Sequence, residues 1–105
     1  MTDREALQAT LAEIIDLLVA HGDTYVVDRL QGYQARLQTD GAGVTRTLYA
    51  EVSGGSGSLR DRYLCAANGD RIIEAEERTV NARLNSLVER LAQQTRPARL
   101  SGLLS

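Results

Sequence analysis

The sequence of 105 residues has no lysine, no phenylalanine and no tryptophan, and it has only one cysteine and one histidine. The cysteine, Cys65, cannot form an internal disulfide, and Cys65 and His21 do not make a pair with metal-ligand spacing. Without lysine, the chain also lacks the residue that contacts the phosphates in a Gly-rich nucleotide-binding loop. We therefore predict no metal site and no cofactor, and the sequence favours a protein without catalytic activity over an enzyme.

Long apolar runs and a concentrated basic surface are also missing. The most apolar stretch, residues 14–20, contains Asp16 and is too short to span a membrane. It follows acidic residues instead of the basic start of a secretory signal. The formal net charge of −2 does not suit nucleic-acid binding, which needs a basic surface. We expect a cytoplasmic protein that binds neither membranes nor nucleic acids.

What the sequence does contain is helical periodicity, with a hydrophobic fraction of 43% that is typical of a globular domain. Thr2 and Glu5 have the spacing of a capping box, and Gly22 is placed to end a helix at the C′ position. We therefore predict a first helix over residues 3–21. Its apolar face repeats at spacings of one, three and four, with Leu7, Leu11, Ile14, Ile15 and Leu18.

A second helix is expected directly after the first, capped by Asp23 or Thr24. The short gap predicts that the two helices form an antiparallel hairpin. Gly32 weakens the second helix by about 1 kcal/mol relative to alanine, and one explanation is the close approach of a neighbouring backbone. The apolar face of this helix is predicted to comprise Val26, Val27, Leu30, Tyr33 and Leu37.

Two more helices complete a mostly α fold. A short one is predicted over residues 43–52 and a long one over 74–96, which Pro97 stops. Together the elements predict a compact helical bundle, with a single domain over residues 1–96 and a tail over 97–105. The apolar positions expected in the last two helices are Val44, Leu48 and Val52, then Val80, Leu84, Leu87 and Leu91.

The stretch from Gly54 to Asp61, Gly-Gly-Ser-Gly-Ser-Leu-Arg-Asp, interrupts the helical pattern and predicts a turn, because its glycines tolerate positive φ. Further on, Asn68-Gly69 lies between apolar residues, which is a hairpin signal. Two structures fit this part of the sequence. One is a small β ribbon that pairs residues near 63–66 with 71–74, and the other is an irregular connection followed directly by a helix.

Four parts of the sequence together resemble a family of short, functionally uncharacterised bacterial proteins. They are His21-Gly22-Asp23, the central Gly-Gly-x-Gly-Ser-Leu-x-Asp motif over 54–61, Asn68-Gly69, and Asn81 with Leu84. The family often has Met or Phe where this chain has Ser56, and often a tryptophan on the second helix. The resemblance implies no activity. Its small bacterial members are similar to immunity or accessory proteins, which act by binding.

The central motif is the candidate functional site, since binding residues are often carried on loops. We expect a non-enzymatic module that binds another protein, either a different chain or a second copy in a homodimer. The predicted binding residues are Ser58, which fixes the loop, Leu59, which anchors it, and Arg60 and Asp61, which make charged contacts.

Two other functions fit the sequence as well. The backbone of residues 54–58 can bind an anion or another small ligand, in a binding protein or in an enzyme where Asp61 or His21 transfers protons. Alternatively, the chain is a structural homo-oligomer.

Overall fold

Apolar side chains at helical spacing account for the helices of the computed structural model, which describes residues 3–53, 59 and 62–97. The first helix, α1 (Asp3–Ala20), buries every apolar position predicted for it. It ends in a Schellman motif around Gly22, whose φ is +74°. The N–H of Gly22 donates to the Val19 carbonyl at 3.1 Å, and the N–H of Asp23 donates to the Leu18 carbonyl at 3.0 Å. The predicted role of Gly22 is confirmed.

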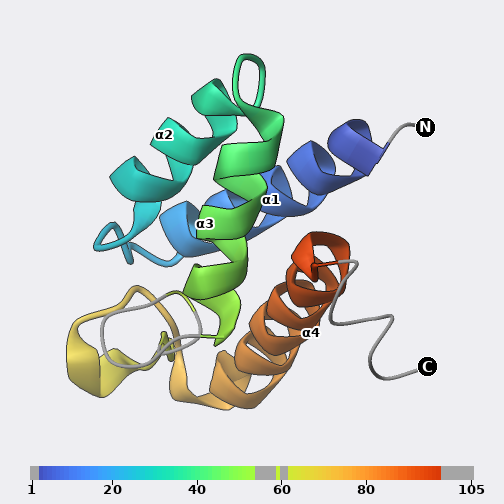
Figure 1. The fold of residues 1–105 in the computed structure, drawn as a ribbon. Helices are drawn as coiled ribbons and strands as arrows, with labels where there is room; N and C mark the ends of the chain where they lie inside the picture. The colour runs from blue at the N-terminus through green and yellow to red at the C-terminus, as the bar shows by residue number, and fades with distance from the viewer. Residues whose placement is uncertain (1–2, 54–58, 60–61, 98–105) are drawn as a thin grey trace.

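The second helix, α2 (Val27–Arg36), begins later than predicted. Its N-cap is Val26, which makes no side-chain capping bond, so the predicted caps Asp23 and Thr24 are wrong. At Gly32, an added Cβ would have no neighbour within 4 Å, so the close-approach explanation of this glycine is also wrong. The chain does turn back as expected, since α2 runs opposite to α1 (Figure 1).

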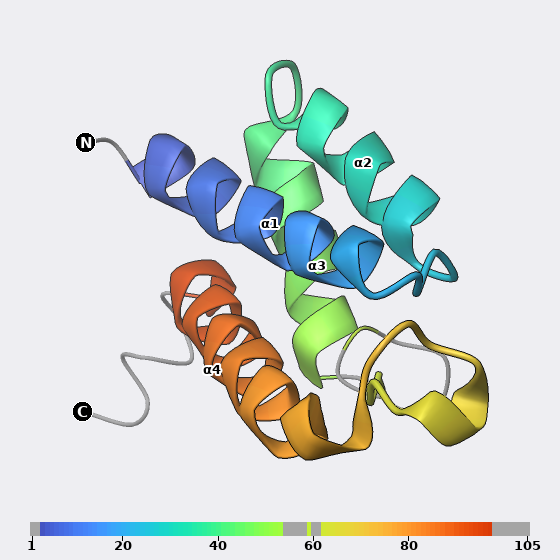
Figure 2. The same ribbon diagram turned by 180° about the vertical axis from the view of Figure 1, so that it is seen from behind.

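The third helix, α3 (Gly41–Ser53), buries its predicted stripe of Val44, Leu48 and Val52. Asp40 caps its first turn, accepting the N–H of Gly43 at 3.1 Å. The last helix, α4 (Glu77–Thr95), packs against both α1 and α3 and ends before Pro97, as predicted. In both views, α1 and α3 cross at the centre of the molecule, with α2 on one side and α4 on the other (Figures 1 and 2).

Residues 62–76, which we call the connecting segment, lead into α4. They contain two short 3-10 turns, η2 (Ala66–Asn68) and η3 (Glu74–Glu76), and no strand. Gly69 ends η2 with a φ of +87°, so the glycine of the Asn-Gly pair terminates a turn instead of forming a hairpin. Of the two structures predicted here, the β ribbon is wrong, and the irregular connection followed by a helix is what the chain adopts.

Candidate functional site

The predicted loop site is only partly described. Ser58, Arg60 and Asp61 lie outside the described residues, as does most of the glycine-rich stretch. Leu59 is described, and it belongs to the hydrophobic core with only 1% of its surface exposed. Its backbone N–H donates to Glu51 Oε2 at 3.0 Å. Leu59 therefore joins the chain to the core immediately before the connecting segment.

Glu51, near the end of α3, is the buried carboxylate that receives this bond. It also accepts hydrogen bonds from Arg29 Nη2 at 3.1 Å and from the Tyr33 hydroxyl at 2.9 Å. The hydrogen bond to Glu51 raises the pKa of Arg29 above its ordinary value. Burial, and after it the bond to Glu51, raises the pKa of Tyr33. One acidic side chain thus ties two residues of α2 to the backbone at Leu59.

The corner between α1 and α2 holds the start of the connecting segment through Asp23. Its side chain is almost fully buried and binds Arg62 in a bidentate ion pair, with N···O distances of 2.8 and 2.9 Å. Asp23 also accepts the N–H of Tyr25 at 3.3 Å, and the Arg62 guanidinium lies 4.9 Å from the centre of the Tyr25 ring. This use of the Asp23 carboxylate explains why it does not cap α2.

The same corner holds the middle of the connecting segment through His21 and Arg71. The N–H of Arg71 donates to the His21 carbonyl at 2.6 Å, and His21 Nδ1 lies 2.8 Å from the Arg71 carbonyl oxygen. Nδ1 therefore carries the proton that it donates. Arg71 also reaches back to the Val19 carbonyl at 3.3 Å. The only histidine of the chain is thus engaged in fixing backbone position.

On α4, Asn81 holds a third point of the segment. Its amide oxygen accepts the N–H of Leu64 at 2.8 Å, and its amide nitrogen donates to the Leu64 carbonyl at 2.7 Å and to the Glu77 carbonyl at 2.8 Å. Asn81 therefore pairs with Leu64 as a neighbouring strand would. Beside it, the Glu77 carboxylate accepts the N–H of Ala66 at 2.8 Å. Backbone groups that a sheet would satisfy are satisfied here by side chains.

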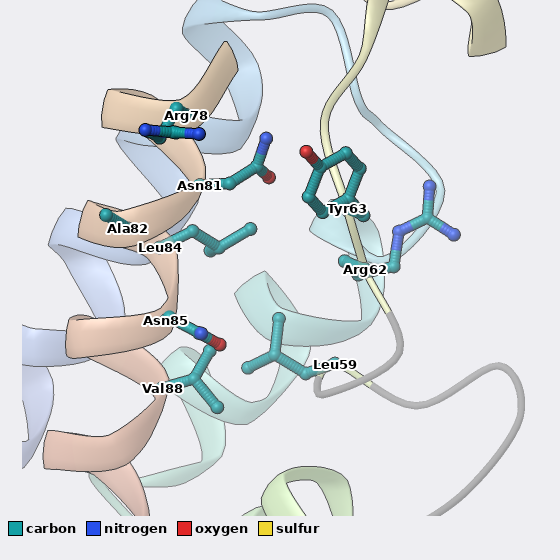
Figure 3. A pocket seen from close by; sticks show the side chains of 9 residues that line it. All are labelled: Leu59, Arg62, Tyr63, Arg78, Asn81, Ala82, Leu84, Asn85 and Val88. Atoms are coloured by element: carbon teal, nitrogen blue, oxygen red, sulfur yellow. The ribbon is translucent and has the colours of Figure 1, made fainter.

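A cleft of about 270 Å³ lies between the connecting segment and α4 (Figure 3). Leu59, Leu84 and Val88 supply its apolar lining. Tyr63 and Asn81 face each other across it, whereas Arg62 points its guanidinium away from α4. The remaining lining residues come from α4 and are Arg78, Ala82 and Asn85. The cleft is smaller than a typical small-molecule pocket, for which about 300 to 1,000 Å³ is usual.

Four large apolar side chains are exposed in the described part of the chain, and we call them together the corner surface: Val19, Tyr25, Tyr63 and Ile73. Val19 and Tyr25 flank the α1–α2 corner, and the other two belong to the connecting segment. The exposed fractions of Tyr25, Tyr63 and Ile73 are 64, 56 and 62%. The contacts of His21 and Asp23 described above join these two stretches. Aromatic side chains with a polar tip are typical anchors of protein interfaces.

Sequence reasoning missed the residues that hold the connecting segment. The sequence did place Glu51 on a buried helix face, because Glu51 lies three residues after Leu48 in the apolar stripe of α3. Asn81 has the same relation to the buried face of α4, since it lies three residues before Leu84. A polar residue on a buried helix face needs a hydrogen-bond partner, and here the partner is the backbone of the chain that follows α3. Nothing in the local sequence indicated the pairing of Asp23 with Arg62.

No group of three or more potential metal ligands occurs within 3–53, 59 and 62–97. Over the same ranges, none of the helices combines the length and apolarity needed to cross a membrane. No family model, curated protein or solved structure matches the chain. The resemblance to short bacterial proteins therefore stays a prediction.

Proposed function

We propose that this protein is a binding module that holds another protein against the corner surface and the adjoining cleft. The observation that carries the proposal is the grouping of the exposed side chains. All four large apolar residues that are exposed in the described ranges occur on two stretches of chain that are hydrogen-bonded to each other. Scattered exposed apolar residues need no explanation, but a group of them is typical of an interaction site.

The chemistry of this surface suits a protein partner better than a small ligand. Tyr63 and Arg62 both line the cleft. The guanidinium of Arg62 also lies over the ring of Tyr25, so tyrosine and arginine side chains are neighbours here. Both residue types are enriched at interface positions that contribute most to affinity. The neighbouring cleft is small, but it can accept one side chain of a partner. Its Tyr63 and Asn81 then provide polar groups at the rim.

The way in which the connecting segment is held also supports binding. Ordering a loop on association costs affinity, so a loop that is already fixed binds more tightly. The polar contacts of Asp23, His21 and Asn81 fix the connecting segment before a partner arrives. We keep Ser58, Arg60 and Asp61 in the proposed site, because they adjoin Leu59 and Arg62 in the sequence and both of these line the cleft.

The experiment starts from capture of partners in a lysate of the source organism and continues with the purified partner. Affinity is then measured by calorimetry for the wild type, Tyr63→Ala and Ile73→Asp. Gln93→Ala serves as the control, because Gln93 is exposed and lies near the end of α4, whereas the connecting segment leads into its start. We expect stoichiometric binding, weakened at least about tenfold by the first two variants, as for interface anchors worth more than 1 kcal/mol. The control should bind like the wild type.

Equal affinity of Tyr63→Ala, Ile73→Asp and the wild type would overturn the proposal. Light scattering on the purified chain tests the homodimer as well. If the wild type is a dimer and Ile73→Asp is a monomer, the partner is a second copy, and the proposal of a different chain fails. Circular dichroism on each variant confirms folding, which we expect because both substituted side chains are largely exposed.

A further inference from the structure

A second cleft lies at the other end of α1, where the start of α1, the start of α3 and the end of α4 meet. Its volume is about 470 Å³, and three arginines line it: Arg4, Arg46 and Arg96. Arg4 reaches from α1 toward the first residue of α3, since a Cβ added at Gly41 would lie 3.5 Å from Arg4 Nη2. We call this cavity the arginine cleft.

The arginines of the cleft differ from most others in the described part of the chain. Elsewhere Arg29, Arg36, Arg62, Arg83 and Arg90 each pair with a carboxylate. Within residues 3–53, 59 and 62–97, none of the three cleft guanidinium groups forms an ion pair or a side-chain hydrogen bond. Three guanidinium groups without a carboxylate partner around one cavity make a positively charged site.

We propose that the arginine cleft binds a small phosphate monoester. Among its lining residues Asp3 is the one acid, so the three arginines leave the cleft with a surplus of two positive charges. A phosphate monoester carries a charge of about −1.5 to −2 at neutral pH and matches this surplus, whereas one carboxylate would neutralise only half of it. The planar fork of arginine also suits two-point contact with phosphate oxygens.

The rest of the lining fits the organic part of such a ligand. Leu7, Leu37 and Pro97 offer apolar contact beside the arginines. Gln94 lines the cleft too, and its Oε1 is a buried oxygen without a hydrogen-bond partner in the described residues. The Gln94 Nε2 donates to the Ala6 carbonyl at 3.4 Å, and a hydroxyl group on the ligand is the donor that Oε1 lacks. The cavity volume lies within the range of small-molecule sites.

The test is a titration of the full-length protein with glycerol 3-phosphate and, separately, with inorganic phosphate at low ionic strength, followed by amide NMR shifts. Arg46→Gln and the double variant Arg4→Gln/Arg96→Gln remove charge from the cleft. Arg78→Gln is the matched control, because Arg78 is exposed, has no ion pair in the described residues and lies at the far end of α4. All of these side chains are exposed, so the variants should fold.

We expect amide shifts centred on Thr45 and Gln94, and tighter binding of glycerol 3-phosphate than of inorganic phosphate. Arg46→Gln should bind the ester at least about tenfold more weakly, which is the effect of losing one hydrogen bond to a charged group. The control should change affinity little. Equal weakening by Arg78→Gln would show unspecific attraction of anions and overturn the proposal. Shifts confined to other parts of the chain would overturn it as well. Equal affinity for both ligands would leave a simple anion site and contradict a monoester ligand.

Discussion

The helices and the connecting segment are held in place by different interactions. In the helices, residues such as Leu11 and Leu30 are fully buried among other apolar side chains. Among the described side chains of the connecting segment, Leu64 and Ile72 are the buried ones, and polar side chains of the helices and the α1–α2 corner hold its backbone. Apolar burial is non-directional and tolerates adjustment, whereas hydrogen bonds fix position and direction.

Stability and structural specificity therefore come from different parts of the molecule. The helical core provides most of the free energy of folding, because the hydrophobic effect is its main source. The contacts of Glu51, Asp23, His21 and Asn81 decide where the irregular chain lies. They thereby set the position of Tyr63 and Ile73, which belong to the corner surface.

Truncation in the core should have the largest effect. Leu11→Ala removes a fully buried side chain of α1 and should lower the free energy of unfolding by about 3 to 5 kcal/mol. Urea denaturation measures this change. Because the loss is global, the midpoint should shift equally whether helix signal or tyrosine fluorescence is followed. A loss below 1 kcal/mol would mean that the apolar core is not the main support of the fold.

Removal of the buried carboxylate should rank second. Glu51→Ala leaves the Leu59 N–H and the Tyr33 hydroxyl without an acceptor, and it should cost about 2 to 3 kcal/mol. The ion pair adds little to this figure, since the Arg29 side chain is 37% exposed and solvent screens its charge. Glu51→Gln is the matched control, because it keeps an acceptor for Leu59 and should lose about half as much. If the two variants were equally destabilised, charge and not the hydrogen bond to Leu59 would dominate.

One glycine in α2 should be replaceable with a gain in stability. Gly32→Ala should raise the free energy of unfolding by about 1 kcal/mol, because Gly32 is in mid-helix and nothing lies within 4 Å of an added Cβ. Gly69→Ala is the contrasting variant, since the φ of Gly69 is +87° and alanine is strained there. It should destabilise the protein. Thermal melts of both variants check the opposite signs.

The smallest effect concerns alkaline pH. The raised pKa of Tyr33 means that the folded state favours the protonated phenol. The resulting stability is fully present below the unfolded-state pKa of about 10 and is lost as pH rises through the folded-state value. The free energy of unfolding should therefore fall more steeply above pH 10 in the wild type than in Tyr33→Phe. A steeper fall in Tyr33→Phe would reverse the sign and contradict the assigned environment.

The same comparison explains what the sequence could reveal. The α-helices were predictable because their apolar residues repeat over short distances, and even the Schellman motif at Gly22 follows from local chemistry. The connecting segment was not, because its contacts join distant residues. Asp23 and Arg62 are 39 positions apart, and His21 and Arg71 are 50 apart. The Asn-Gly pair at 68–69 was ambiguous for the same reason, since long-range contacts decide between turn and hairpin.

The candidate site was predictable only in part. The glycine-rich stretch pointed to the end of α3, and Leu59 there does line the cleft. The corner surface was missed, because the exposure of Tyr25 and Ile73 depends on how two separate stretches of chain meet. An amphipathic pattern predicts which face of a helix is buried, but it says nothing about exposure in an irregular segment.

The most direct test of the account is native-state hydrogen exchange in Asn81→Ala, with Asn85→Ala as the control on the same helix. If polar contacts hold the connecting segment as a unit separate from the core, the amides of Leu64 and Arg71 should exchange about tenfold faster in Asn81→Ala, as for loss of roughly 1.4 kcal/mol in local opening. The amide of Leu11 in α1 should exchange at the wild-type rate, and Asn85→Ala should change neither. Equal acceleration at Leu11 and Leu64, or none at Leu64, would contradict the claim that the segment is held independently of the helical core.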